Sequence, residues 1–379
     1  MHHRKIILQK EYKFVILRYE ERQDGCMKYQ KVMEDLRMHI EKGDFADANK
    51  LPTEDNLCTR YGVSRQTVRH ALSLLEQEGL IRRQQGSGSH IVRAETASPR
   101  QRVIAVITTY ISDYIFPSIL REIETVLAKN NSRPMLFATQ NQVISERNVL
   151  TSLLSLPQLD GILVEGTKTA LPNPNLDLYR KLLARNIPIV FMNGNYRELE
   201  VPSVLDDNFS GGYMLVQHLY NKGHRNIAGV FKSDDIQGHQ RYAGYAQAML
   251  ECGLVPDDAH ICWYTTESKE GITAWQEPFA QQIISALSGC SAVVCYNDEI
   301  AVAVLSAMLR QGLRIPEDLA VVSFDNSKYS EIGPLRITSL SHGENNVGRL
   351  AAQMLVEQLN GGVLSSCLAP WTLVVRDSD

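Results

Sequence analysis

The 379-residue sequence lacks the features of membrane-spanning, secreted and metal-binding proteins. No apolar run approaches the roughly 18 residues that cross a bilayer. The opening stretch, MHHRKIILQKEYKFVILRY, has no unbroken apolar core and no small-residue cleavage site of a secretory signal. The seven cysteines are an odd number without a CxxC pair, which favours reduced thiols over a disulfide framework or a zinc site. We therefore expect a cytoplasmic protein without a metal or other cofactor.

Motifs of catalysis are missing as well. The sequence has no GxSxG nucleophile elbow, no HExxH zinc motif and no P-loop. The adjacent pairs Asp206-Asp207 and Asp234-Asp235 do not make a paired acid and base, because neighbouring side chains on a strand point to opposite faces. We expect that the protein is not an enzyme.

A net positive charge is found in one short part of a chain whose larger part is acidic. Residues 60–93 carry six Lys and Arg residues against two acidic ones, whereas residues 94–379 carry 22 basic and 30 acidic residues. A basic module on an acidic protein indicates a polyanionic partner for that module alone. A merely solvated basic face is the alternative that the composition leaves open.

The basic module reads as a winged helix-turn-helix. Apolar residues recur every four positions over about 29–42, which predicts a first helix. Thr53 is a plausible N-cap of a short second helix, Gly62 forms a turn, and Ser64 caps a third helix that Gly79 closes. The segments LIRR, QQGSGS and HIVR then predict a strand, a glycine-rich turn and a strand.

The sequence divides into four parts. Residues 1–26 have no place in the helical pattern, and we expect them to be a disordered extension or an upstream mis-start. The DNA-binding domain is expected over 27–93, a short polar linker over 94–101, and an effector and dimerisation domain over 102–379.

The first turn of the third helix carries the side chains that could read DNA. In a recognition helix this turn reaches base edges in the major groove, where arginine can bind guanine and glutamine can bind adenine bidentately. The wing glycines allow a close approach to the DNA backbone. These candidates are Ser64, Arg65, Gln66, Thr67, Arg69, Gln85, Gly86, Ser87 and Gly88. Each also has a simpler explanation: Ser64 could only cap the helix, the glycines could only close the hairpin, and any one arginine could be a solvated charge.

Beyond the linker, near-continuous apolar strands alternate with helices, from VIAVITT to LAVVSFD. This alternation predicts parallel sheets covered on both faces, and two such series indicate an α/β fold with two doubly wound lobes. Ligands of such folds bind outside the carboxyl ends of the strands, which here places the site in a cleft between the lobes.

Polar and aromatic side chains gather at these strand ends, as a site for a free sugar requires. Hydrogen-bonding groups would hold the hydroxyls, and aromatic faces would stack on the C–H surfaces. The candidates are Tyr110, Tyr114, Phe116, Glu165, Lys168, Asn193, Arg241, Asn297, Asp325 and His342. Charged groups in these places are costly unless they are paired, so convergence on a polar ligand is plausible.

Alternatives remain for several of these residues. Arg241 and Asp325 could pair with each other across the cleft, and Asp298 could be the N-cap of the following helix instead of a ligand contact. Tyr114 and Phe116 could belong to the core or to a dimer contact.

Two family resemblances support this picture. The stretch LPTEDNLCTRYGVSRQTVRHALSLLEQEGLIRRQQGSGSHIV resembles the winged helix-turn-helix of the GntR family of bacterial repressors, with its LP(S/T)E, GVSR(x)TVR and GxG(S/T) motifs. This resemblance implies that Glu54, Arg65, Gln66, Thr67, Arg69 and the wing residues 86–88 face DNA.

The rest of the chain resembles the sugar-responsive domain of LacI/GalR repressors, in KGHRNIAGV, RYAGYAQAM, CYNDEIAVAVL and RIPEDLAVVSFD. The combination of both parts resembles the L-arabinose-responsive repressors of Gram-positive bacteria. It implies a periplasmic-binding-protein-like body, a homodimer on double-stranded operator DNA, and release by L-arabinose. Another sugar effector, or a sugar-binding protein without a DNA function, is the alternative. LacI-type pockets often have aspartate at the position of Asn193, so its contact is open.

Overall fold

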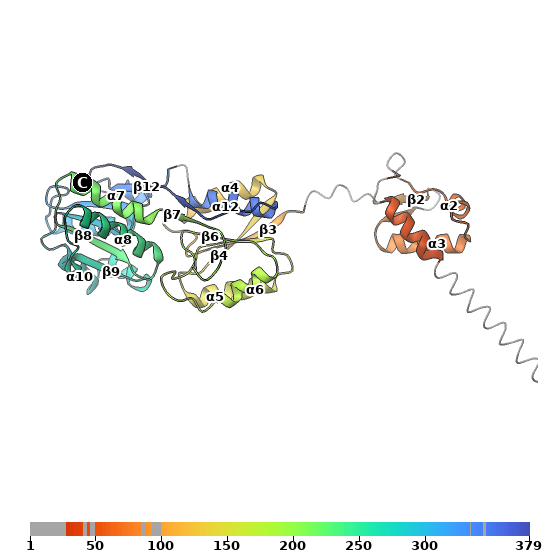
Figure 1. Cartoon of the computed structure of the whole chain (residues 1–379), viewed down its shortest axis with the longest axis horizontal. Helices are drawn as coiled ribbons and strands as arrows, with labels where there is room; N and C mark the ends of the chain where they lie inside the picture. The colour runs from red at the N-terminus through yellow and green to blue at the C-terminus, as the bar shows by residue number, and fades with distance from the viewer. Residues whose placement is uncertain are drawn as a thin grey trace, which may run out of the picture. The chain divides into compact units, whose positions relative to one another are not determined.

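The computed structural model describes residues 28–40, 44–45, 50–84, 88–92, 100–333, 335–343 and 346–379. The chain divides into two compact units between Arg100 and Gln101 (Figure 1). The expected extension over 1–26, most of the expected linker over 94–101 and the wing residues Gln85, Gly86 and Ser87 lie outside the described residues. None of the helices that the structure describes has the length and apolarity to cross a bilayer.

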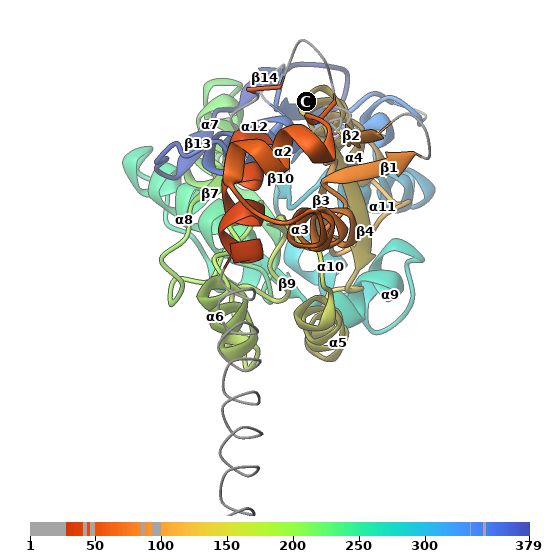
Figure 2. The same ribbon diagram turned by 90° about the vertical axis from the view of Figure 1, so that its right-hand side faces the viewer.

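The smaller unit has the predicted order of helices and strands. Residues 28–40 are helical. They are followed by α2 (Glu54–Tyr61), α3 (Arg65–Gln77), β1 (Ile81–Gln84) and β2 (Gly88–Ile91). The strands β1 and β2 form an antiparallel hairpin that lies beside α3 (Figure 2).

The predicted caps of this unit are confirmed. The side chain of Thr53 accepts a hydrogen bond from the backbone of Asn56, and that of Ser64 accepts one from the backbone of Thr67. Gly62 ends α2 in the left-handed region, with a φ of 63° that favours glycine. The turn between α2 and α3 therefore depends on local chemistry that the sequence shows directly.

One apolar core joins the three helices and the hairpin. Val68, Leu72 and Leu75 form the buried stripe of α3, as their spacing predicts. They pack against Leu36 of the first helix and Leu57 of α2, all of which are almost fully buried. The opposite face of α3 is left for other contacts.

The larger unit consists of two lobes, and each lobe has one six-stranded sheet. The first lobe has the strand order β13-β7-β6-β5-β3-β4, with parallel pairing throughout. Its strands are β3 (Arg102–Thr108), β4 (Ser132–Ala138), β5 (Gly161–Val164), β6 (Ile189–Met192), β7 (Ser203–Asp206) and β13 (Cys367–Ala369). Its helices are α4 (Phe116–Lys129), α5 (Val143–Ser155), α6 (Leu176–Ala184) and α12 (Val347–Leu359).

Alternate residues of these strands serve the two faces of the sheet. Ile104 and Val106 pack beneath α4 and α12, whereas Ala105 and Ile107 pack against α5 and α6. The helices accordingly cover the sheet from both sides (Figure 1). The near-continuous apolar strands of the sequence are explained by this double burial.

The second lobe repeats the arrangement with the order β14-β12-β11-β10-β8-β9, in which only β14 is antiparallel. Its strands are β8 (Ile227–Lys232), β9 (Ile261–Tyr264), β10 (Ala292–Cys295), β11 (Ala320–Phe324), β12 (Thr338–Ser341) and β14 (Thr372–Val374). Its helices are α7 (Asn208–Asn221), α8 (Ile236–Glu251), α9 (Lys269–Thr273), α10 (Phe279–Leu287) and α11 (Asp298–Arg310).

The chain passes between the lobes after β7, between β12 and α12, and between β13 and β14. The parallel strands of both sheets direct their carboxyl ends toward these passages, which is the edge of such sheets where ligands commonly bind.

The helices α7 and α8 lie unusually close together because of two glycines. A Cβ atom added to Gly244 would lie 1.9 Å from the carbonyl oxygen of Phe209, and one added to Gly212 would lie 2.0 Å from that of Arg241. Neither position has room for a larger residue without a shift of one helix.

We expect Gly244→Ala to lower the free energy of unfolding of the larger unit by about 1–3 kcal/mol, because the helices must separate. Gln247→Ala, at an exposed position of the same helix, is the matched control and should change it by less than about 0.5 kcal/mol. Thermal and denaturant unfolding of both variants measure the difference. Equal stability of the two variants would contradict the close packing.

Candidate functional site

A single carboxylate organises the arginines of the smaller unit. Glu54 Oε2 accepts hydrogen bonds from Arg69 Nε at 2.9 Å and from Arg65 Nε at 3.2 Å, and its Oε1 accepts one from Arg83 Nη2 at 2.9 Å. Burial raises the pKa of Glu54, but the hydrogen bonds from Arg69 and Arg65 outweigh it and lower the pKa below its usual value. The carboxylate is therefore charged at neutral pH and pairs with Arg65 and Arg69, whose side chains remain largely exposed.

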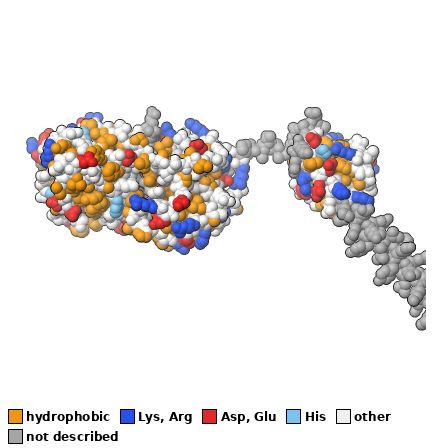
Figure 3. Space-filling view, in the orientation of Figure 1, with side chains coloured by type: hydrophobic (Ala, Val, Ile, Leu, Met, Phe, Trp, Pro, Cys, Tyr) orange, Lys and Arg blue, Asp and Glu red, His pale blue; other side chains and the backbone are white. Residues whose placement is uncertain are grey.

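The other predicted DNA contacts have different surroundings. Arg65, Gln66 and Arg69 are exposed on α3, while Thr67 is half-buried and bonds with the hydroxyl of Ser64 at 2.9 Å. The role of Ser64 as a helix cap is thus present in the structure. In the space-filling view, basic and acidic side chains lie beside each other on this unit (Figure 3). Gly88 begins β2 with a φ of 96°.

We expect Glu54→Gln to reduce the ratio of operator affinity to random-DNA affinity by about tenfold, because Arg65 and Arg69 lose the charge that orients them. Asp55→Asn is the matched control. It removes the same charge one residue away, where Asp55 is exposed and only approaches Arg65 at 3.6 Å. Both variants should bind random DNA more tightly, since each loses one negative charge near the phosphates.

Fluorescence anisotropy with an operator and a scrambled duplex, over a series of salt concentrations, measures both affinities. An unchanged ratio in Glu54→Gln would mean that the arginines need no orienting carboxylate.

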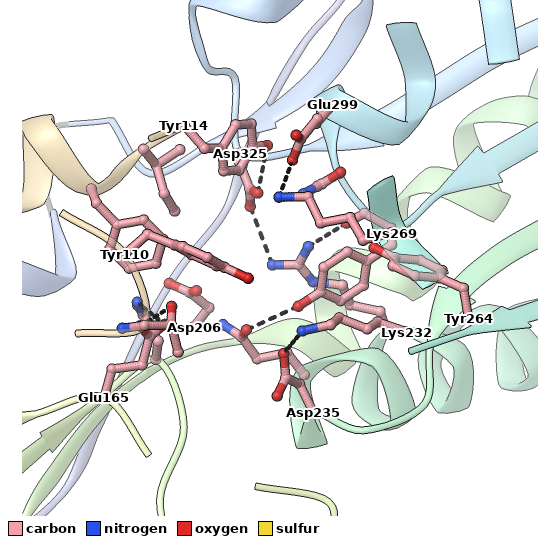
Figure 4. Close-up of a pocket in the computed structure, with 18 residues that line it drawn as sticks. Tyr110, Tyr114, Glu165, Asp206, Lys232, Asp235, Tyr264, Lys269, Glu299 and Asp325 are labelled. Carbon is pink, nitrogen blue, oxygen red and sulfur yellow. Dashed lines mark hydrogen bonds and ion pairs between the residues drawn. The ribbon is translucent and has the colours of Figure 1, made fainter. Parts of the chain in front are cut away.

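A small cavity of about 70 Å³ lies between the lobes of the larger unit (Figure 4). Eight of the ten residues predicted to bind a ligand line it. They are Tyr110, Tyr114, Phe116, Glu165, Asn193, Arg241, Asn297 and Asp325.

The first lobe contributes a carboxylate with several hydrogen-bond partners. Glu165 Oε2 accepts hydrogen bonds from the backbone N–H and the hydroxyl of Thr109, at 2.8 and 2.6 Å. Its Oε1 accepts one from Asn193 Nδ2 at 3.0 Å. Burial raises the pKa of Glu165, and these hydrogen bonds offset part of the rise. Asn193 therefore faces the cavity as a partner of Glu165.

The second lobe contributes Arg241, whose side chain is almost fully buried. Its Nε donates to Asn208 Oδ1 at 2.9 Å, its Nη1 donates to the carbonyl oxygen of Tyr296, and its Nη2 lies 3.2 Å from Asp325 Oδ1. The guanidinium also lies 4.2 Å from the centre of the Phe324 ring. The alternative pairing of Arg241 with Asp325 is thus present, but within one lobe and not across the cleft.

Tyr114 joins the two lobes at the cavity wall. Its hydroxyl donates to Asp325 Oδ2 at 2.7 Å and accepts from the backbone N–H of Asp298 at 3.1 Å. This contact joins the turn before α4 in one lobe to Asp325 after β11 and Asp298 at the start of α11 in the other, so it ties the cavity wall to the position of the lobes.

The cap of α11 is Asn297 and not Asp298, which corrects that alternative. Asn297 Oδ1 accepts a hydrogen bond from the backbone of Ile300 at 3.0 Å. Asp298 instead accepts hydrogen bonds from the hydroxyls of Ser323 and Ser339, and burial raises its pKa to about 6. Its carboxylate therefore has a structural role beneath the cavity.

Lys168 and His342, the other two residues predicted to bind a ligand, do not line this cavity. The ammonium of Lys168 is bonded to Glu267 and lies 3.5 Å from Asp234, so it pairs across the lobes. His342 lies behind Asp206, with its Nδ1 at 3.1 Å from Asp206 Oδ1. Both residues follow strands, but their side chains turn toward carboxylates of their surroundings.

Several residues of the cavity wall were not predicted from the sequence. Lys232 is the last residue of β8 and pairs with Asp235, so the rule of strand ends could have found it. Lys269 and Glu299 belong to helices and are paired at 2.7 Å, and Lys269 lies 5.2 Å from the centre of the Tyr110 ring. Both residues lie four or five positions beyond a strand end, inside the helix that follows, and their pairing becomes apparent only in the folded arrangement. The remaining additions are Thr109, Ile115, Asp206, Gln237, Tyr264 and Tyr296.

Negative charge exceeds positive charge in this wall. The carboxylates are Glu165, Asp206, Asp235, Glu299 and Asp325, and the cations are Lys232, Arg241 and Lys269. Each of the three cations already has a carboxylate partner. A neutral ligand with many hydroxyls suits this wall better than a phosphorylated or carboxylated one. Among the described residues, no group of His, Cys, Asp and Glu is arranged to hold a metal ion.

Comparison with known proteins connects both units to gene regulation. Residues 28–91 match the "Bacterial regulatory proteins, gntR family", and residues 216–378 match the "Periplasmic binding protein-like domain". The chain is 36% identical to the arabinose metabolism transcriptional repressor of Halalkalibacterium halodurans, over 87% of this chain and 88% of the relative. It is 35% identical to that of Geobacillus stearothermophilus, over 93% of this chain and 97% of the relative.

The chain belongs to this family of transcriptional repressors. The larger unit of the repressor is also similar to the crystal structure of the transcription regulator CcpA of Lactococcus lactis, with a TM-score of 0.64 and 25% identity over 74% of this chain and 99% of the other. The predicted combination of a GntR-type DNA-binding domain with a two-lobed periplasmic-binding-protein-like body is thereby confirmed. The repressor has one unit of the DNA-binding type and another with a cavity between its two lobes.

Proposed function

We propose that the repressor is a cytoplasmic homodimer that controls genes of arabinose utilisation and leaves its operator when L-arabinose binds in the interlobe cavity. The observation that carries this proposal is the cavity itself, which combines aromatic rings with amide and carboxylate groups and no unpaired cation. The two relatives in arabinose metabolism favour L-arabinose among the sugars.

The charge and the lining of the cavity argue for a free sugar. An acidic wall repels phosphate and carboxylate groups, whereas hydroxyls can donate to Glu165, Asp206 and Asp325. Tyr110 and Phe116, whose rings meet edge to face with centres 5.9 Å apart, offer an apolar surface for sugar C–H groups.

The exposed first turn of α3 supports DNA reading by the smaller unit. Arg65 and Gln66 would contact base edges, and Ser64 and Thr67 would contact phosphates, with the wing alongside. Two copies of the unit would read the two halves of a roughly palindromic operator. Operator DNA places the working protein in the bacterial cytoplasm, and regulation by binding needs no enzymatic step.

Release follows from linkage between the two sites. Sugar weakens operator binding only if it binds more tightly to the state that cannot hold both half-sites, and DNA then weakens sugar binding by the same factor. The Tyr114 contacts to Asp325 and Asp298 are suited to this coupling, since they connect the cavity to the relative position of the lobes.

We expect L-arabinose to release the full-length repressor from operator DNA, whereas ribose 5-phosphate does not, because the acidic wall repels the phosphate. Anisotropy of labelled operator, titrated with L-arabinose, D-xylose, D-ribose, D-glucose and ribose 5-phosphate, measures the release. Asn193→Ala should still bind operator but should need about tenfold more sugar for release, because a hydrogen-bonding group and the partner of Glu165 are lost.

Release by another sugar alone would mean that the effector is not L-arabinose. Binding of operator without release by any of these compounds would contradict a sugar effector altogether.

A further inference from the structure

The three passages between the lobes bring one side chain each to the same point. Asp206 is the last residue of β7, His342 directly follows β12, and Trp371 lies between β13 and β14. The rings of His342 and Trp371 have centres 4.2 Å apart, and His342 Nδ1 lies 3.1 Å from Asp206 Oδ1. We call these three residues the hinge cluster.

Each member of the hinge cluster has a buried polar atom without a saturating hydrogen bond. These atoms are Asp206 Oδ1, His342 Nδ1 and Trp371 Nε1. The first two lie 3.1 Å apart, at ion-pair distance, and Asp206 also borders the cavity, so their mutual arrangement affects the surface that a ligand meets.

Asp206 also belongs to the cavity wall, where it lies beside Glu165 and near the Tyr110 ring (Figure 4). It is 3% exposed. The hinge cluster thus touches the ligand site through one carboxylate, while His342 and Trp371 lie behind it. This arrangement was not visible in the sequence, because the three residues are far apart along the chain.

Charge around His342 favours its cationic form. Burial of the imidazole opposes protonation, but the carboxylates of Asp206 and Asp325 outweigh this effect and the nearby Arg241, so the pKa of His342 lies above its usual value. The neighbour from the third passage, Trp371, is uncharged. An imidazolium beside Asp206 would fix the direction of that carboxylate.

We propose that Asp206 contacts the effector and that His342, resting on Trp371, is a positioning residue that directs the Asp206 carboxylate into the cavity at the hinge between the lobes. The identity of the sugar in this inference rests on the proposed function. Because lobe closure must move the three passages relative to one another, the hinge cluster connects the sugar hydroxyls with the closing motion. Effector affinity should therefore depend on pH through His342.

The first experiment uses the ligand-free full-length chain and needs no effector. A raised pKa of His342 in the folded state means that its contribution to stability is fully present below about pH 6.5 and is lost as the pH rises through the raised value. Between pH 6 and pH 8.5, the wild type should lose about 2–4 °C of its melting-temperature advantage over His342→Asn. His239→Asn, an exposed histidine on α8, is the control and should keep the wild-type response.

The second experiment measures L-arabinose affinity by calorimetry at the same pH values. Asp206→Asn should weaken binding about tenfold or more, because a hydrogen bond to a charged acceptor is lost. His342→Asn should weaken it by a smaller factor at pH 6.5 and should flatten the pH profile, while His239→Asn leaves both unchanged.

Each possible outcome of the two experiments supports or overturns one part of the proposal. A melting difference between wild type and His342→Asn that is independent of pH overturns the charged pair and leaves His342 as packing only. A pH-dependent difference together with unaltered sugar affinity in Asp206→Asn overturns the contact. A wild type that binds no L-arabinose contradicts the proposed function, and the sugar contact fails with it, whereas the melting experiment still decides the hinge pair.

Discussion

The guanidinium of Arg241 is buried in the second lobe, where its charge is stable only because oxygen atoms of the same lobe accept its hydrogen bonds. Its partners come from three places: Asn208 at the start of α7, the Tyr296 carbonyl after β10, and Asp325 after β11. Removing one partner would leave a buried charge uncompensated, which is costly. Because the Arg241 charge must be paired by all three partners, the relative positions of these three segments are fixed. The cavity wall depends on those positions.

The same constraint extends to the first lobe through Asp325. One of its oxygens faces Arg241 and the other accepts the hydroxyl of Tyr114. Asp325 thus connects a charge of the second lobe to an aromatic residue of the first. Any ligand in the cavity would therefore act on a network that spans both lobes.

Much of this architecture could be predicted because local chemistry determines it. The caps at Thr53 and Ser64, the buried stripe of α3 and the doubly buried strands follow from spacing and side-chain type alone. The rule that ligands meet strand ends brought Glu165 and Arg241 into the predicted site.

Other features depend on contacts between distant segments. Sequence patterns placed His342 near the ligand but could not show that Asp206 lies between them, since the two residues are 136 positions apart. In the same way Glu54 was expected to face DNA, whereas its three arginine partners on α3 and β1 become apparent only in the folded unit. Long-range pairing of charges is the information that a single sequence does not contain.

The pairing of Lys168 has a kinetic consequence. Its ammonium joins Glu267 and Asp234 of the other lobe, and nearby Asn141 donates to Thr266 at 2.6 Å and to Asp235 at 3.2 Å. A molecule enclosed between lobes that are clasped in this way can leave only after several polar contacts break together. Under the proposed function, the rate at which the effector leaves is then governed by the opening of these contacts and not by the cavity wall alone.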